Sequence, residues 1–304
     1  MIENWNRHIR ERGDHLETDE LRQEADDILA RGPNAWNEIP KLEKTERERQ
    51  IIEALNIALN EYLDFMGLDR LEFSESEIFI VDDVYYRNNY PDFNGHQAVS
   101  GNHSRIIIPR ILNEHRFVTI LAHEMVHGVS YRRTSAEFKI NDNNLLEFRI
   151  ADNYRSGFRF GRVNNRLEDL KLFQFLGLNE AMTEFIAYKV RRYYYRSQGE
   201  FGEKAEELAD MGAYTLEFGI LGRVLQKYKQ LGNDEQELMV DIQRGYFLGD
   251  MRPLKKLQVI HPDIVKIFRD MKHSDINSLI STARVLGLVE YVEKLEEIAK
   301  TIKK

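Results

Sequence analysis

The sequence predicts an α+β fold that is mostly helical, with a small mixed sheet in the first half of the chain. Apolar residues recur at helical spacing over residues 1–70 and again over residues 201–304. Between them, residues 71–112 contain short runs of β-branched and aromatic residues separated by turn residues, which is typical of strands. We therefore expect an N-terminal helical region (1–70), a core (71–200) and a C-terminal helical region (201–304) packed with that core.

The composition is that of an ordinary globular protein. Of the 304 residues, 42% are hydrophobic and 31% are charged, so the chain is long enough to bury a sizeable core. The formal net charge of −8 argues against nucleic acid as the main partner. The absence of cysteine excludes disulfides and thiolate metal sites.

The N-terminal region contains two helical patterns and no chemical motif. Asp19–Leu29 is a short amphipathic stretch, and Lys44–Met66 carries a long apolar stripe close to the helical period. Gly67 is placed to cap the end of the second helix. We interpret this region as a scaffold packed on the core.

Residues 71–112 are expected to form strands. Glu77–Asp82 and Val84–Tyr86 are rich in residues that favour strands. Gln97–Ser100 and Ser104–Pro109 are separated by a short polar turn, which predicts a hairpin.

One uncharged helical stretch, Phe117–Tyr131, contains the motif H-E-x-x-H. His123 and His127 are four residues apart, so both imidazoles can reach one metal ion, with Glu124 beside them. Apart from the motif this stretch has no charged residue, which predicts a buried helix. Buried His and Glu side chains need partners, and a metal ion supplies one. The alternative is two core histidines with hydrogen-bond partners and a glutamate paired to an arginine.

A catalytic zinc ion takes three protein ligands, so a third ligand is required. The continuation H-E-x-x-H-x-x-G-x-x-H is excluded, because Ser130 and Arg133 stand where glycine and histidine are needed. A later helical stretch carries Glu180 and Glu184, which share one face. We expect Glu180 to bind the metal and Glu184 to accept a hydrogen bond from the outer nitrogen of a ligand histidine.

His123-Glu-x-x-His127 followed by N-E-A-M-T-E at residues 179–184 resembles the gluzincins, the thermolysin-like zinc metallopeptidases. The resemblance covers about the middle third of the chain. It implies a zincin-like metallopeptidase core and a Zn²⁺ cofactor held by His123, His127 and Glu180. It also implies that Glu124 is the general base for a zinc-activated water. Histidine and carboxylate ligands in this motif favour zinc among the divalent ions.

The same resemblance implies a substrate-binding edge strand and a second donor to the developing oxyanion. In gluzincins an edge strand pairs with an extended peptide, for which our candidates are Gln97, Ala98 and Val99. The oxyanion donor in that group is a Tyr or His outside the two motifs. Tyr214 is our first candidate and Tyr154 the second.

Residues 132–177 separate the two motifs. Glu147–Ala151 and Arg155–Phe160 are expected to form a hairpin around Asp152–Tyr154. This insert forms either one wall of the substrate pocket or a surface excursion without contact to substrate.

From residue 178 onward the chain has helical patterns. The helix with the two glutamates spans residues 178–198. Further helices are expected at Glu203–Met211, Tyr214–Gln230, Glu235–Gly245, Asp263–Met271, Ile276–Leu286 and Val289–Ile302.

The sequence thus favours a zinc metallopeptidase that hydrolyses peptide bonds in a peptide or protein substrate. Two alternatives stay open: a catalytically silent or latent zincin-fold protein acting through protein interactions, and a leaderless secreted toxin-like protease. The first residues lack the features of a signal peptide, and the sequence has no run of eighteen apolar residues. We therefore expect a cytoplasmic protein without a membrane partner.

Overall fold

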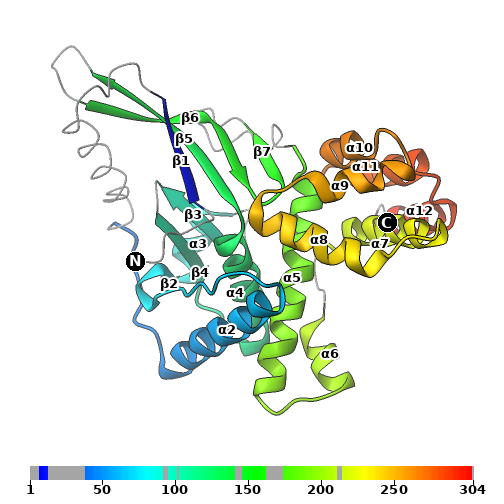
Figure 1. The fold of residues 1–304 in the computed structure, drawn as a ribbon. Helices are drawn as coiled ribbons and strands as arrows, with labels where there is room; N and C mark the ends of the chain where they lie inside the picture. Colours follow the sequence, from blue (N-terminus) through cyan, green and yellow to red (C-terminus); the bar gives the residue numbers. More distant parts are fainter. Residues whose placement is uncertain are drawn as a thin grey trace. The chain divides into compact units, whose positions relative to one another are not determined.

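The computed structural model describes residues 7–12, 38–91, 95–100, 103–140, 146–161, 174–210 and 214–302. It has the predicted α+β, mostly helical fold (Figure 1). By their contacts the residues form two compact units, Met1–Tyr154 with Ala187–Asp210, and Arg155–Ile186 with Met211–Lys304. Helix α5 (Leu176–Ser197) contributes residues to both units. The three regions expected from the sequence stay a prediction.

The first unit contains the predicted small mixed sheet. Its strand order is β2-β4-β3, with β2 parallel and β3 antiparallel to the central strand β4 (Figure 1). The strands are β2 (Ile78–Val81), β3 (His96–Ser100) and β4 (His103–Pro109). The predicted hairpin of β3 and β4 is confirmed. Every residue of β2 is buried, as expected for a continuous apolar run.

A second sheet has the strand order β1-β5-β6-β7. Its strands are β1 (Arg7–Arg12), β5 (Arg132–Ile140), β6 (Leu146–Ser156) and β7 (Arg159–Gly161). Strand β1 pairs in parallel with β5, so Arg7–Arg12, in the region that we expected to be helical, form a strand. This pairing joins segments more than a hundred residues apart, which no local pattern reports.

The hairpin turn predicted at Asp152–Tyr154 was also wrong. Strand β6 continues through these residues, and the turn lies at Gly157 and Phe158. Gly157 has φ +55°, a left-handed conformation that favours glycine over the polar residues on which the prediction rested.

Val84–Tyr86, predicted as strand, belongs to helix α3 (Asp83–Asn89). The side chain of Asp82 accepts hydrogen bonds from the backbone N–H groups of Val84 and Tyr85, at 2.9 and 3.1 Å. This N-cap satisfies two donors of the first turn, and the cap outweighs the strand preference of the apolar residues. The predicted helix Asp19–Leu29 lies outside the described residues.

Helix α2 (Glu46–Phe65) confirms the long N-terminal helix. It begins with a capping box in which the Thr45 hydroxyl accepts from the Glu48 N–H, and the Glu48 carboxylate accepts from the Thr45 N–H. Met66, one residue before Gly67, is the C-cap; Gly67 follows with φ +65°.

Helix α4 (Glu114–Val129) carries the H-E-x-x-H motif and packs on β3 and β4. Asn113 caps it, and its first turn is tied to two other helices. Glu114 forms an ion pair with Arg47 of α2, and His115 Nδ1 lies 2.8 Å from the Tyr195 hydroxyl of α5. These contacts fix the start of α4 against its neighbours within this unit.

The second unit is built around the first half of α5. The Asn179 side-chain oxygen accepts from the backbone N–H groups of Phe158 and Arg159, at 3.0 and 3.2 Å. The Thr183 hydroxyl lies 2.6 Å from the Tyr246 hydroxyl of helix α8 (Glu235–Leu248). The first two turns of α5 therefore hold both the β6–β7 turn and α8.

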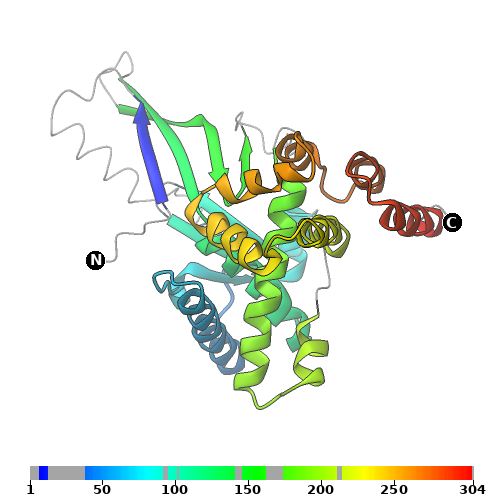
Figure 2. The ribbon, with the colours of Figure 1, turned by 45° about the vertical axis from the view of Figure 1, so that its right-hand side comes forward.

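The remaining predicted helices are confirmed with shifts of up to three residues at their ends (Figures 1 and 2). A short helix, α9, was not predicted because five residues are too few to show a helical period. Of the helices that the structure describes, none has the length and apolar character that crossing a bilayer requires. The helices are α6 (Glu203–Ala209), α7 (Thr215–Gln230), α9 (Arg252–Lys256), α10 (Ile264–Asp270), α11 (Ile276–Val285) and α12 (Val289–Ile302).

Asn179→Ala should lower the free energy of unfolding by about 2–6 kcal/mol, because it leaves the N–H groups of Phe158 and Arg159 without their acceptor and each such loss costs about 1–3 kcal/mol. Urea denaturation measures this change. Asn89→Ala, at an exposed position of α3, is the control and should change stability by less than about 0.5 kcal/mol. Equal stability of the two variants would contradict the anchoring role of Asn179.

Candidate metal centre

The two histidines of α4 lie side by side, as their spacing predicts. Their Nε2 atoms are 3.1 Å apart, and the two ring planes are inclined at 77°. His123 is 9% exposed and Glu124 is 7% exposed, so the prediction of a largely buried motif is confirmed. Two nitrogens this close can share one cation or one proton.

The spacing of the two nitrogens suits a zinc ion. With Zn–N distances of about 2.0–2.1 Å, two ligands of a tetrahedral site lie about 3.3 Å apart. The observed 3.1 Å is close to this value. The two imidazoles therefore need little movement to bind one ion.

Glu180 of α5 joins the two histidines. One ligand atom from each of His123, His127 and Glu180 can be chosen so that all three atoms lie within 4.8 Å of one another. Glu180 is 7% exposed. Within the described ranges, no other group of three or more His, Cys, Asp or Glu side chains is gathered in this way.

Glu184 lies one turn after Glu180 on α5, where the motif predicts it, and is 2% exposed. Its hydrogen bond to a ligand histidine stays a prediction. Asn179 and Thr183 of the same motif anchor the β6–β7 turn and α8, so this part of the motif has a structural role.

Glu124 has a neighbour that the sequence did not reveal. Burial and the negative charge of Glu124 raise the pKa of the Tyr86 phenol. Tyr86, on α3, is 1% exposed and therefore stays a neutral phenol beside the carboxylate. The sequence placed Tyr86 in a strand and gave no signal for this contact.

The candidate substrate strand has the predicted position in its sheet. Gln97, Ala98 and Val99 lie in β3, at one end of the strand order β2-β4-β3. An end strand of this kind can pair with an extended peptide. Their contact with a substrate stays a prediction.

Tyr214 belongs to a cluster with His273 and Glu217. It is the N-cap of α7 with φ +62°, and its ring centroid lies 4.7 Å from that of His273. His273 Nδ1 lies 3.4 Å from a carboxylate oxygen of Glu217, which also accepts from the Ser274 N–H at 2.9 Å. Burial opposes the ionisation of Glu217, but these hydrogen bonds lower its pKa. Tyr154, the second candidate, lies in β6.

The turn that carries His273 packs on the start of α5. A Cβ added to Gly177 would lie 3.0 Å from the carbonyl oxygen of Met271, so the two backbones are close together. Gly177 precedes Glu180 by about one helical turn. His273 is a candidate oxyanion donor that the sequence did not reveal, because an isolated histidine in a polar turn has no periodic signal.

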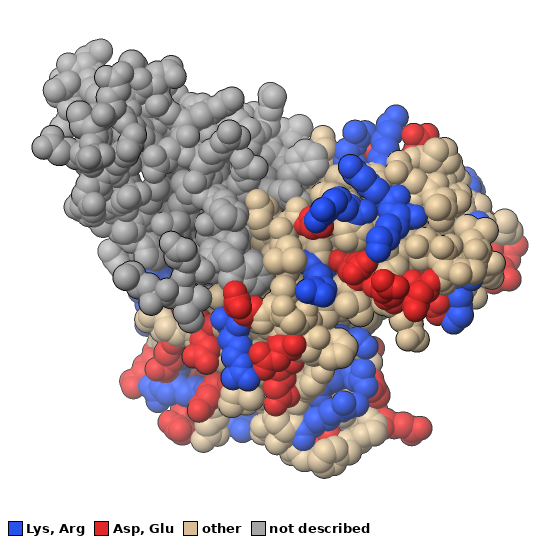
Figure 3. Space-filling model, viewed as in Figure 1, with Lys and Arg blue, Asp and Glu red and all other residues tan. Residues whose placement is uncertain are grey.

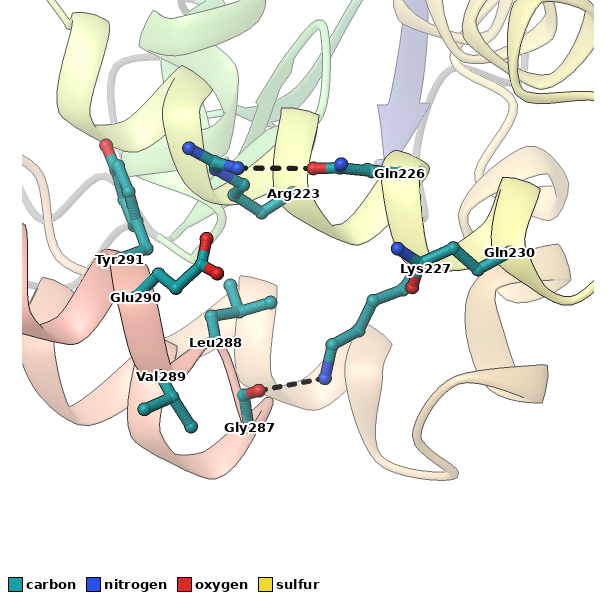
Figure 4. Close-up of a pocket in the computed structure, with 9 residues that line it drawn as sticks. All are labelled: Arg223, Gln226, Lys227, Gln230, Gly287, Leu288, Val289, Glu290 and Tyr291. Atoms are coloured by element: carbon teal, nitrogen blue, oxygen red, sulfur yellow. Dashed lines mark hydrogen bonds between the residues drawn. The ribbon is translucent and has the colours of Figure 1, made fainter.

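A cavity of about 300 Å³ lies between α7 and the turn joining α11 to α12 (Figure 4). On one side of this cavity, Lys227 Nζ donates hydrogen bonds to the carbonyl oxygens of Leu286 and Gly287, both at 2.9 Å. No residue predicted for the metal site lines this cavity. Its lining is Arg223, Gln226, Lys227, Gln230, Gly287, Leu288, Val289, Glu290 and Tyr291.

Charged side chains of both signs are interspersed over the described part of the face in Figure 3. Among the described residues, ion pairs include Arg70 with Asp64 at 2.7 Å and Arg49 with Glu75 at 2.8 Å.

Comparison of the chain with protein-family models, with curated proteins and with solved structures gave no match in any of the three. A function for this protein is therefore inferred from the residues of this chain.

Proposed function

We propose that this protein is a zinc metallopeptidase of the gluzincin type. The observation that carries the proposal is the gathering of His123, His127 and Glu180 within 4.8 Å, with Glu124 next to His123 on α4. The order of the two motifs along the chain and the edge position of β3 support it. In this proposal, α4, α5 and the β2-β4-β3 sheet form a zincin-like core.

The donor atoms fit zinc. Two imidazoles and one carboxylate are a common ligand set of catalytic zinc, which keeps its fourth position open. With no cysteine in the chain, thiolate ligands are excluded. When bound, zinc supplies a Lewis acid that lowers the pKa of a water molecule and polarises the scissile carbonyl.

The chain's own residues would provide the remaining chemistry. Glu124 would take a proton from the attacking water and deliver it to the leaving amine. The backbone of β3 would align an extended peptide by strand pairing. Tyr214 or His273 would donate a hydrogen bond to the oxyanion.

The parent protein should contain one zinc ion per chain, and His123→Ala should contain little. Glu180→Ala should abolish tight binding, whereas Glu184→Ala should weaken it about 10- to 100-fold, as loss of a residue supporting a ligand does. Elemental analysis and zinc titration measure these values. Glu53→Ala, at an exposed position of α2, is the control. The reverse order for the two α5 glutamates would mean that Glu184 is the ligand.

Glu124→Gln keeps the shape of the side chain but removes its basicity. This variant should fold and bind zinc like the parent but should not cleave a peptide library. Mass spectrometry of the library detects the products. A parent that binds zinc yet cleaves nothing, even after limited proteolysis of its ends, would favour a metal-binding protein without peptidase activity. Equal cleavage by the parent and by Glu124→Gln would mean that another residue is the general base.

Tyr214→Phe or His273→Ala should lower kcat by about 10²- to 10³-fold with little change in KM, as removal of an oxyanion donor does. Steady-state kinetics on a cleaved peptide separate the two constants. His261→Ala, a half-buried histidine of the same unit, is the matched control. If both variants keep the parent kcat, the donor is a different residue.

A further inference from the structure

Gly95 is a buried glycine directly before β3, and its backbone lies against α4. A Cβ at this position would stand 2.5 Å from Cγ2 of Ile120, 3.4 Å from Cγ of Glu124 and 3.5 Å from Cγ1 of Ile108. Carbon atoms in contact are normally about 3.5–4.0 Å apart. Only a residue without a side chain lets the start of β3 approach α4 this closely.

The neighbours of Gly95 have little freedom to make room. Ile120 is β-branched and lies in a helix, where one χ1 rotamer is strongly preferred. Ile108 is fully buried in the central strand β4. An added methyl group would therefore displace either the start of β3 or the side chain of Ile120, one turn before Glu124 on α4.

The need for glycine at position 95 comes from packing. The contact of Gly95 is made with the helix of the H-E-x-x-H motif and includes the glutamate of that motif.

Glu124 is enclosed on more than one side. Its Cγ lies against Gly95, and burial together with the negative charge of Glu124 raises the pKa of the Tyr86 phenol. With 7% exposure, Glu124 has little solvent space into which it could rotate.

We propose that Gly95 is a positioning residue for Glu124. By letting β3 start in contact with α4, it sets the distance between the strand that would pair with a peptide and the carboxylate that would take the proton. This inference rests on the proposed function. A misplacement of about 1 Å in such an arrangement can cost about 100-fold in rate.

The test is a double-mutant cycle on the zinc-loaded protein with acetohydroxamate as the probe. A hydroxamate chelates zinc through two oxygens and can hydrogen-bond to a carboxylate beside the metal. Calorimetry gives Kd for the parent, Gly95→Ala, Glu124→Gln and the double variant. Gly95→Ala should weaken binding about tenfold or more in the parent, because hydrogen bonds to charged groups depend strongly on geometry. In the Glu124→Gln background, Gly95→Ala should change Kd less than twofold.

A second variant distinguishes a local clash in Gly95→Ala from misfolding of that variant. Ile120→Ala removes the Cγ2 atom that an added Cβ would strike. Alone it should bind the probe within about twofold of the parent, and combined with Gly95→Ala it should restore most of the lost affinity. Zinc content and circular dichroism of each variant confirm that the fold and the metal are retained.

Two results would overturn the inference. One is a Kd of Gly95→Ala equal to that of the parent, and the other is equal weakening in both backgrounds, which would exclude Glu124 as the intermediary. A zinc-loaded parent that neither binds acetohydroxamate nor cleaves peptides would instead refute the proposed function, and the role of Gly95 would be refuted with it.

Discussion

The approach of the His123 and His127 imidazoles, with Nε2 atoms 3.1 Å apart, is the contact on which the candidate site depends. Two nitrogens in a largely buried place cannot both donate toward each other, so one must accept or a cation must lie between them. A buried glutamate one residue away adds a negative charge, which favours a cation in this place. A divalent cation would satisfy these requirements together.

This arrangement requires α4 to be held firmly, and the structure shows how. Asn113 caps its start, Arg47 pairs with Glu114, and His115 contacts Tyr195. Along its length, α4 packs on β3 and β4. The exposed ion pair contributes little free energy by itself, so packing on the sheet is the main source of this rigidity.

The N-E-A-M-T-E motif contains both a candidate metal ligand and residues that anchor neighbouring elements to α5. Glu180 is part of the candidate metal centre, whereas Asn179 and Thr183 hold the β6–β7 turn and α8 to the same turns of α5. Displacement of those anchors would change the direction of α5 near its start and therefore the position of Glu180. The motif thus contains the candidate ligand Glu180 and also the residues that hold its helix in place.

The sequence by itself determined the features that depend on neighbours within a few residues. The helical spacing of apolar residues located most helices, and the i, i+4 spacing placed His123 beside His127. The hairpin of β3 and β4 followed from two strand-like runs around a short turn. The glutamate pattern placed Glu180 and Glu184 on one helix.

Tertiary structure decided what depends on segments far apart in the chain. The pairing of β1 with β5, the partnership of Tyr214 with His273, and the approach of Gly95 to α4 join residues that no local pattern connects. Closing such long-range contacts depends on the packing of whole elements, so composition and periodicity within one segment cannot report them. The same reason explains why the contact of Gly95 with α4 has no signal in the sequence.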